Sequence, residues 1–103
     1  MQRMRDYELV MVISPEAGED ETSVALERVS SFVAAHGGSI SEQESWGVRR
    51  LAYPIGGFQE GGYALTRFSL EAGDVLELDQ SLMAADDVLR HLLTRAPRSS
   101  LQT

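Results

Sequence analysis

Hydrophobic positions along the chain form short strand-like runs separated by two longer helical stripes. Residues 7–13 are rich in aromatic, β-branched and aliphatic residues, which is typical of a buried central strand. Hydrophobic side chains then recur every three or four residues from about 20 to 36 and again from 74 to 85, which predicts two amphipathic helices. Gly37 and Gly38 end the first stripe, because glycine readily adopts the left-handed backbone of a helix C-terminus.

Three further segments are expected to be extended. Residues 39–55 form a long run in which Gly47 predicts a bulge or bend. Residues 56–62 contain four glycines and predict a hairpin loop of moderate length, after which residues 63–70 return antiparallel. Asp86-Asp87 is expected to turn the chain into a last strand over 88–94.

The resulting order, β-α-β-β-α-β, predicts an α+β fold of the ferredoxin-like type. Right-handed crossovers place the strands in one four-stranded antiparallel sheet with both helices on one face. We expect a single domain over 1–95 and a flexible C-terminal tail over 96–103, which has no periodicity. The other face of the sheet stays open, and this face is where binding is expected.

Composition narrows the functional classes. The chain has 103 residues, 43% hydrophobic and 24% charged, which is typical of a soluble globular domain, and it has no apolar run suited to a membrane helix or signal peptide. We therefore expect a cytoplasmic protein without a membrane partner. The absence of cysteine excludes disulfides, thiolate metal sites and cysteine nucleophiles.

The charge distribution is uneven. A net charge of −7 argues against a generic nucleic-acid binder with a basic surface. All nine basic residues are arginine, a side chain suited to bidentate and stacked contacts, whereas the acidic residues are concentrated in the first predicted helix. Six arginines fall in predicted strands or at their ends: Arg5, Arg49, Arg50, Arg67, Arg90 and Arg95.

No catalytic constellation emerges from the sequence. His36 is expected at a helix C-terminus, where its charge would favour the helix dipole, and His91 lies in a strand with no other histidine at ligand spacing. The glycine pairs at 56–57 and 61–62 precede no helix and no Gly-Lys-Ser/Thr sequence, so they do not indicate a phosphate-binding loop. The sequence predicts neither an enzyme nor a cofactor.

The segment 46–55, with the sequence WGVRRLAYPI, is the most informative part of the chain. Alternation along a strand would place Arg49, Leu51 and Tyr53 on one face and Arg50 on the other. Neither face is purely apolar, which predicts an edge strand whose charges block unwanted pairing. Contact of the arginines with phosphate or with a protein partner is compatible with that role. For the two aromatics Trp46 and Tyr63, core packing and stacking on a partner both remain open.

This segment is similar to the signature of the bacterial small-subunit ribosomal protein S6 family. Residues 4–8, 62–63 and 88–91 resemble the family's opening, third strand and final strand, in the same order. The resemblance implies the ferredoxin-like fold and a structural role in the platform of the 30S subunit, with 16S ribosomal RNA, ribosomal protein S18 and other platform components as partners. By that resemblance the residues expected to contact rRNA or the partner are Arg5, Arg49, Arg50, Tyr53 and Arg90.

Two departures from the family limit what the resemblance implies. Residues 1–3 precede the methionine at which the family usually begins, and the tail lacks a glutamate-rich end, so no glutamate-addition site is expected. An acidic chain can still act on RNA if a basic partner supplies most of the counterion release, and we therefore expect weak RNA binding by this chain alone. The alternatives are a homodimeric small-molecule-binding or regulatory domain of the same fold and a protein-only adaptor that uses the strand edge.

Overall fold

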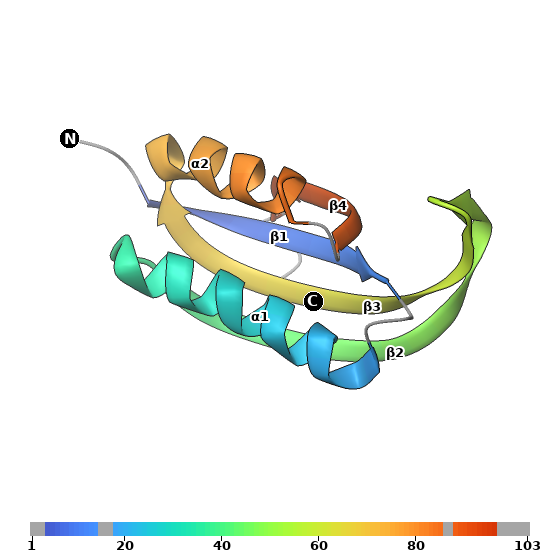
Figure 1. The fold of residues 1–103 in the computed structure, drawn as a ribbon. Coiled ribbons are helices and arrows are strands. Elements are labelled where there is room, and N and C mark those ends of the chain that lie inside the picture. The colour runs from blue at the N-terminus through green and yellow to red at the C-terminus, as the bar shows by residue number, and fades with distance from the viewer. Residues whose placement is uncertain (1–3, 15–17, 86–87, 97–103) are drawn as a thin grey trace.

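The computed structural model describes residues 4–14, 18–85 and 88–96 and has the predicted element order (Figure 1). The elements are β1 (Met4–Ile13), α1 (Gly18–Ala35), β2 (Ser39–Ile55), β3 (Phe58–Glu71), α2 (Ala72–Met83) and β4 (Val88–Arg95). Within these residues the sheet has the order β2-β3-β1-β4, and each neighbouring pair is antiparallel. The two helices lie on the same face (Figure 1), which confirms the ferredoxin-like fold.

The hydrophobic core lies between the sheet and the helices. Alternate residues of β1 face the helices, and Leu9, Met11 and Ile13 are fully buried there. Phe68 of β3 is also buried, and its ring stacks on Tyr7 with 5.8 Å between centroids. The helices complete this core with Ala25, Val29, Val33, Leu78 and Leu82. Because each fully buried aliphatic or aromatic side chain is worth about 1.5–3 kcal/mol, this layer supplies the main driving force for folding.

The hairpin between β2 and β3 differs from the prediction. Only Gly56 and Gly57 form the turn, with φ angles of 58° and 86°, and β3 already begins at Phe58. Two successive positive φ angles match a two-residue type I′ turn. The second glycine pair, Gly61 and Gly62, lies within β3 instead of in a loop, and Gly61 lets β3 pass close to β1.

Other boundaries shift by a few residues. β1 begins at Met4, three residues before the predicted start, and α2 spans Ala72–Met83 where 74–85 was predicted. Gly47 has a φ of 80° at a register shift of β2 against β3, which confirms the predicted bulge. The predicted Asp86-Asp87 turn, the tail after Ala96 and residues 1–3 lie outside the described residues. No described helix is long and apolar enough to cross a membrane.

Candidate interaction surface

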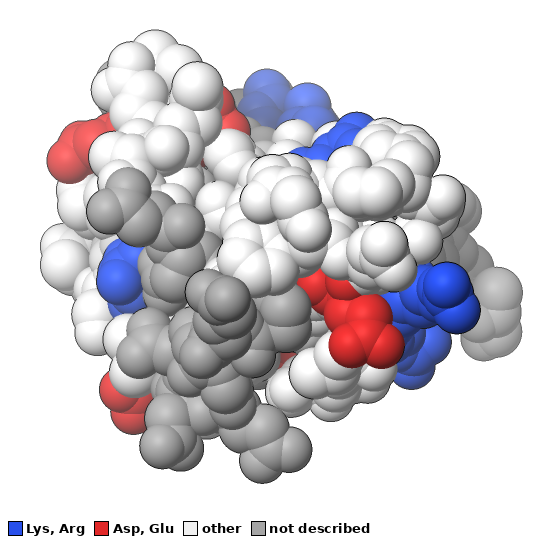
Figure 2. All heavy atoms as spheres, turned by 45° about the vertical axis from the view of Figure 1, so that its right-hand side comes forward, with Lys and Arg blue, Asp and Glu red and all other residues white. Residues whose placement is uncertain are grey.

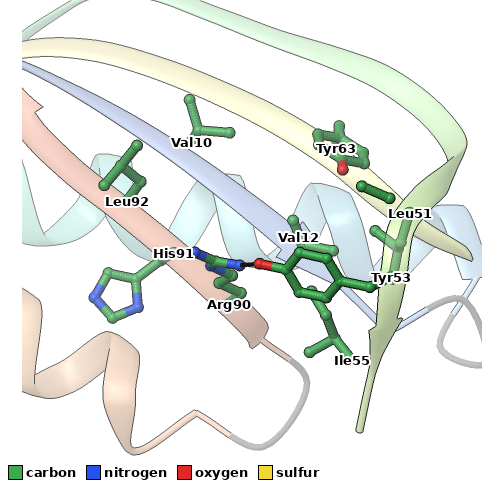
Figure 3. Close-up of a pocket in the computed structure, with 10 residues that line it drawn as sticks. Val10, Val12, Leu51, Tyr53, Ile55, Tyr63, Arg90, His91 and Leu92 are labelled. Atoms are coloured by element: carbon green, nitrogen blue, oxygen red, sulfur yellow. Dashed lines mark hydrogen bonds between the residues drawn. The ribbon is translucent and has the colours of Figure 1, made fainter. Parts of the chain in front are cut away.

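The sheet face opposite the helices carries an apolar hollow of about 230 Å³. Its floor is formed by Val10 and Val12, the β1 residues that alternate with the core residues (Figure 3). Leu92 of β4 lines one side and remains 61% exposed. The full lining is Val10, Val12, Leu51, Ala52, Tyr53, Ile55, Tyr63, Arg90, His91 and Leu92. We call this set the open-face hollow.

The β2–β3 hairpin curls at its tip (Figure 1), and its residues Leu51, Ala52, Tyr53 and Ile55 line one end of the open-face hollow. Tyr53 comes from β2 and Arg90 from β4, which are the two edge strands of the sheet. The curled hairpin brings them together, so that Arg90 Nη1 donates a hydrogen bond of 2.5 Å to the Tyr53 hydroxyl (Figure 3). The Arg90 guanidinium carbon lies 6.0 Å from the Tyr53 ring centroid. Two of the predicted site residues therefore meet across the hollow.

His91 contributes only the edge of the lining. Figure 3 shows its ring directed away from Arg90, on the other side of β4. There its Nε2 lies 2.7 Å from Asp79 Oδ1 of α2. This pair joins β4 to α2, so the His91 ring serves packing on the helix side and only the edge of this residue reaches the open-face hollow.

An aromatic group borders the open-face hollow on the β2 side. The Trp46 ring stacks on Tyr63 at 6.5 Å between centroids, and its indole Nε1 donates a 2.7 Å hydrogen bond to Glu44. The guanidinium group of Arg49 also lies over the Trp46 ring, with its carbon 5.8 Å from the ring centroid. The Arg49 Nε donates a hydrogen bond to the Trp46 carbonyl oxygen. Trp46 remains 39% exposed, so it both packs within the chain and offers ring surface to solvent.

The opposite end of the open face is acidic. Arg67 of β3 contacts Glu8 of β1 at 2.8 Å and Glu42 of β2 at 3.0 Å, and the hydrogen bond with Glu8 raises the pKa of Arg67. The hydrogen bond with Glu44 raises the pKa of Glu42, while the same hydrogen bond and that from Trp46 lower the pKa of Glu44. The six arginines predicted on strands lie there. The predicted separation of acid on helices from base on the sheet is incomplete, because the strand carboxylates of Glu8 and Glu42 pair with Arg67.

The structure separates the remaining predicted site residues. Arg50 lines a second depression at the hairpin, with Gly57 to Glu60, away from the open-face hollow. Arg5 lies near the start of β1, about 23 Å along the strand from the Val12 position opposite Arg90, and it shares the helix-facing alternation of Tyr7. On the face drawn in Figure 2, the arginines of the described residues lie in separate groups. Arg49, Tyr53 and Arg90 border one surface; Arg50 and Arg5 do not.

Sequence reasoning missed the hollow itself. Residues 10 and 12 belong to the run 9–13, which is apolar at every position. Such a run indicates a strand buried on both sides, and it does not indicate which side stays uncovered. Leu92 gave no separate signal for the same reason. The exposed apolar area becomes recognisable only when β1 is flanked by β3 and β4 and both helices occupy the other face.

Comparison with known proteins places this chain among ribosomal proteins. The family described as Ribosomal protein S6 matches residues 6–95. The chain is 37% identical over 92 residues to the small ribosomal subunit protein bS6 of Desulforamulus reducens, covering 89% of this chain and 97% of that protein. It is 38% identical over 93 residues to the bS6 protein of Clostridioides difficile, covering 90% of this chain and all of the relative.

A solved structure is similar throughout. The crystal structure of 30S ribosomal protein S6 from Thermotoga maritima superimposes with a TM-score of 0.85 and 29% identity, covering 97% of this chain and 92% of that chain. The matched segments include both edge strands and all the residues that line the open-face hollow. The chain therefore belongs to the ribosomal protein S6 family, whose members are structural proteins of the small ribosomal subunit and not enzymes.

Proposed function

We propose that this chain assembles with ribosomal protein S18 and 16S rRNA in the platform of the bacterial 30S subunit, on cytoplasmic ribosomes. In this proposal the open-face hollow receives apolar side chains of the basic partner, and arginines at its border and on the β2–β3 hairpin contact rRNA phosphates. The role is structural, because the pair presents a preformed surface to RNA and carries out no chemistry.

The observation that carries the proposal is an uncovered apolar surface bordered by arginines. Leu92 and Tyr53 are 61% and 57% exposed, and apolar surface of this kind marks sites where another protein packs. Among the described residues, no carboxylate lies within ion-pair distance of Arg49, Arg50 or Arg90, whereas Arg67 is held by two. The guanidinium groups of Arg49 and Arg90 at the border of the hollow, and that of Arg50 on the β2–β3 hairpin, thus remain available for phosphate oxygens.

The net charge of this chain implies that the two proteins contribute differently to RNA binding. At −7, this chain repels a polyanion at long range, and its few available arginines cannot release many counterions. A basic partner docked on the open face would supply that long-range attraction. The arginines here would then fix orientation through short contacts, as phosphate contacts do in other complexes.

The test measures binding of a 16S platform fragment to the chain with S18, and compares Arg49→Ala/Arg50→Ala with the unmodified chain. We expect the double variant to weaken binding at least about 100-fold, because each of the two charge-assisted contacts is worth about 1.5–3 kcal/mol. Arg28→Ala on the solvent side of α1 is the matched control and should leave the affinity within twofold. Equal loss in the control variant, or none in the double variant, would remove these arginines from the interface.

The two alternatives have less support. A small-molecule domain would need a larger enclosed site, since ligand pockets usually measure about 300–1,000 Å³ and the open-face hollow is smaller and open. The space between helices and sheet, where such a ligand would lie, is filled by the hydrophobic core. A protein-only adaptor would bind S18 or another protein without RNA, and the same titration would identify it by the absence of any RNA-dependent signal.

A further inference from the structure

Three potential metal ligands meet on the helix side of the molecule, away from the open face. His36 follows the last residue of α1, and Asp74 and Glu77 lie in the first and second turns of α2. One ligand atom from each of the three residues lies within 4.8 Å of the others. The two helix ends also lie at the same end of the sheet in Figure 1. His36 and Asp74 are 38 positions apart in the chain, so no local pattern predicts this group.

The imidazole of His36 is held in the orientation that a metal ligand needs. Its Nδ1 lies 2.9 Å from the Phe32 carbonyl oxygen, which can only accept, so Nδ1 carries the proton. The His36 ring also stacks on Phe32, with 4.1 Å between centroids and 21° between planes. A hydrogen bond from the second ring nitrogen to a carbonyl is the usual support of a metal-binding histidine, and it leaves the Nε2 lone pair free.

The spacing of the ligand atoms fits a shared ion better than direct pairing. His36 Nε2 lies 3.8 Å from Glu77 Oε1, which is beyond hydrogen-bond distance. Two ligands at about 2.1 Å from a tetrahedral zinc ion would be about 3.4 Å apart, so the His36–Glu77 distance needs to shorten by only a few tenths of an ångström. The Asp74 oxygen, within 4.8 Å of both, would move in with its side chain. His91 and Asp79 give the contrast: their atoms are 2.7 Å apart and bond each other directly.

The electrostatic surroundings favour a cation at this point. The C-terminal end of α1 carries the negative end of the helix dipole, and its last turn contains no basic residue. Two carboxylates and a net charge of −7 add to the attraction. One imidazole nitrogen with two carboxylate oxygens is a ligand set that suits zinc and leaves a position for water.

We propose that His36, Asp74 and Glu77 bind one zinc ion, which ties the end of α1 to the start of α2. The ion would join two helices that are linked through the chain only by β2 and β3. None of its residues lines the open-face hollow, so this site lies apart from the surface proposed for the partner.

The test is a calorimetric titration of Zn²⁺ into the full chain after removal of any histidine tag. We expect one ion per chain, and we expect His36→Gln to weaken binding at least tenfold and Glu77→Gln about tenfold. His91→Gln is the matched control, because it removes the other histidine with a carboxylate partner, and it should leave the affinity within twofold. Titration with Co²⁺ should give visible absorption bands that are lost in His36→Gln.

Circular dichroism of each variant establishes that it is folded. Glu77 has a side chain that is 66% exposed, so its replacement keeps the test valid even if His36→Gln destabilises the fold. The proposal is overturned if the chain takes up no stoichiometric zinc, if Glu77→Gln and His36→Gln bind as the unmodified chain does, or if His91→Gln weakens binding equally.

Discussion

The floor of the open-face hollow depends on the absence of a side chain at Gly61. A Cβ built there would lie 2.5 Å from Val12 Cγ1, closer than carbon atoms approach in proteins. The backbone itself would accept alanine, because the glycines with positive φ are 37, 47, 56 and 57. Gly61→Ala should therefore destabilise the fold by overpacking, at a cost of about 1–3 kcal/mol. This cost outweighs the gain of about 0.4–1 kcal/mol that Gly→Ala brings through the unfolded chain.

A double-mutant cycle isolates the contact. Val12→Ala removes Cγ1, the atom that a residue-61 side chain would meet, together with the second methyl group, at a cost of about 1.6 kcal/mol for two buried carbons. With those methyls gone, the nearest atoms to the new Cβ are the Ile13 carbonyl oxygen at 3.4 Å and Leu51 Cδ2 at 3.7 Å. Gly61→Ala should then cost nothing, and the double variant should be no less stable than Val12→Ala alone.

Urea unfolding of the four proteins measures these differences through the midpoint at constant m-value. Each 1 kcal/mol should also lower Tm by about 4–8 °C in a domain of this size. Glu60→Ala, at the exposed neighbouring position in β3, is the control and should change stability by less than about 0.5 kcal/mol. Additive effects in the cycle, or a Gly61→Ala variant as stable as the unmodified chain, would refute the close approach of β3 to β1.

Two further predictions concern the charged groups. Glu44→Gln should lower the pKa of Glu42, because Glu44 raises that pKa whereas Arg67 lowers it. A carbon-detected NMR titration that gives the same Glu42 pKa in the variant and the unmodified chain would contradict this prediction. Because the pKa of Glu42 is raised in the folded chain, the stability that Glu42 contributes is lost as pH rises above the usual pKa of 4.5. Glu44→Gln lowers that pKa, so Glu42 should contribute a smaller loss of stability over the same pH range in this variant. For RNA, Arg49→Ala/Arg50→Ala should reduce the slope of log affinity against log salt by about two, one per phosphate contact, and an unchanged slope would exclude those contacts.

The fold could be predicted from local patterns because each element has its own signal. The 3.6-residue stripe of α1, the glycines after it and the bulge at Gly47 all agree with the structure. The hairpin turn was predicted too long because four glycines look alike in a sequence. Gly56 and Gly57 are required by backbone conformation, whereas Gly61 is required by the space beside Val12, and only the packed sheet distinguishes the two.

The candidate site was less predictable because it depends on contacts between distant segments. Arg49 and Tyr53 could be placed on a common face from alternation along β2, and the structure brings Tyr53 to the hollow. The contact of Tyr53 with Arg90 requires the hairpin to curl across the sheet, which no local pattern reports. Arg5 was grouped with them by resemblance alone, and its position at the other end of β1 separates it from that surface.

Docking on the open face is tested most directly by NMR with isotope-labelled chain and unlabelled S18. We predict that addition of the partner shifts the signals of Val10, Val12, Tyr53 and Leu92, while those of α1 and α2 change little. Shifts confined to the helices, or no shifts at all at concentrations where the two proteins co-sediment, would contradict the account.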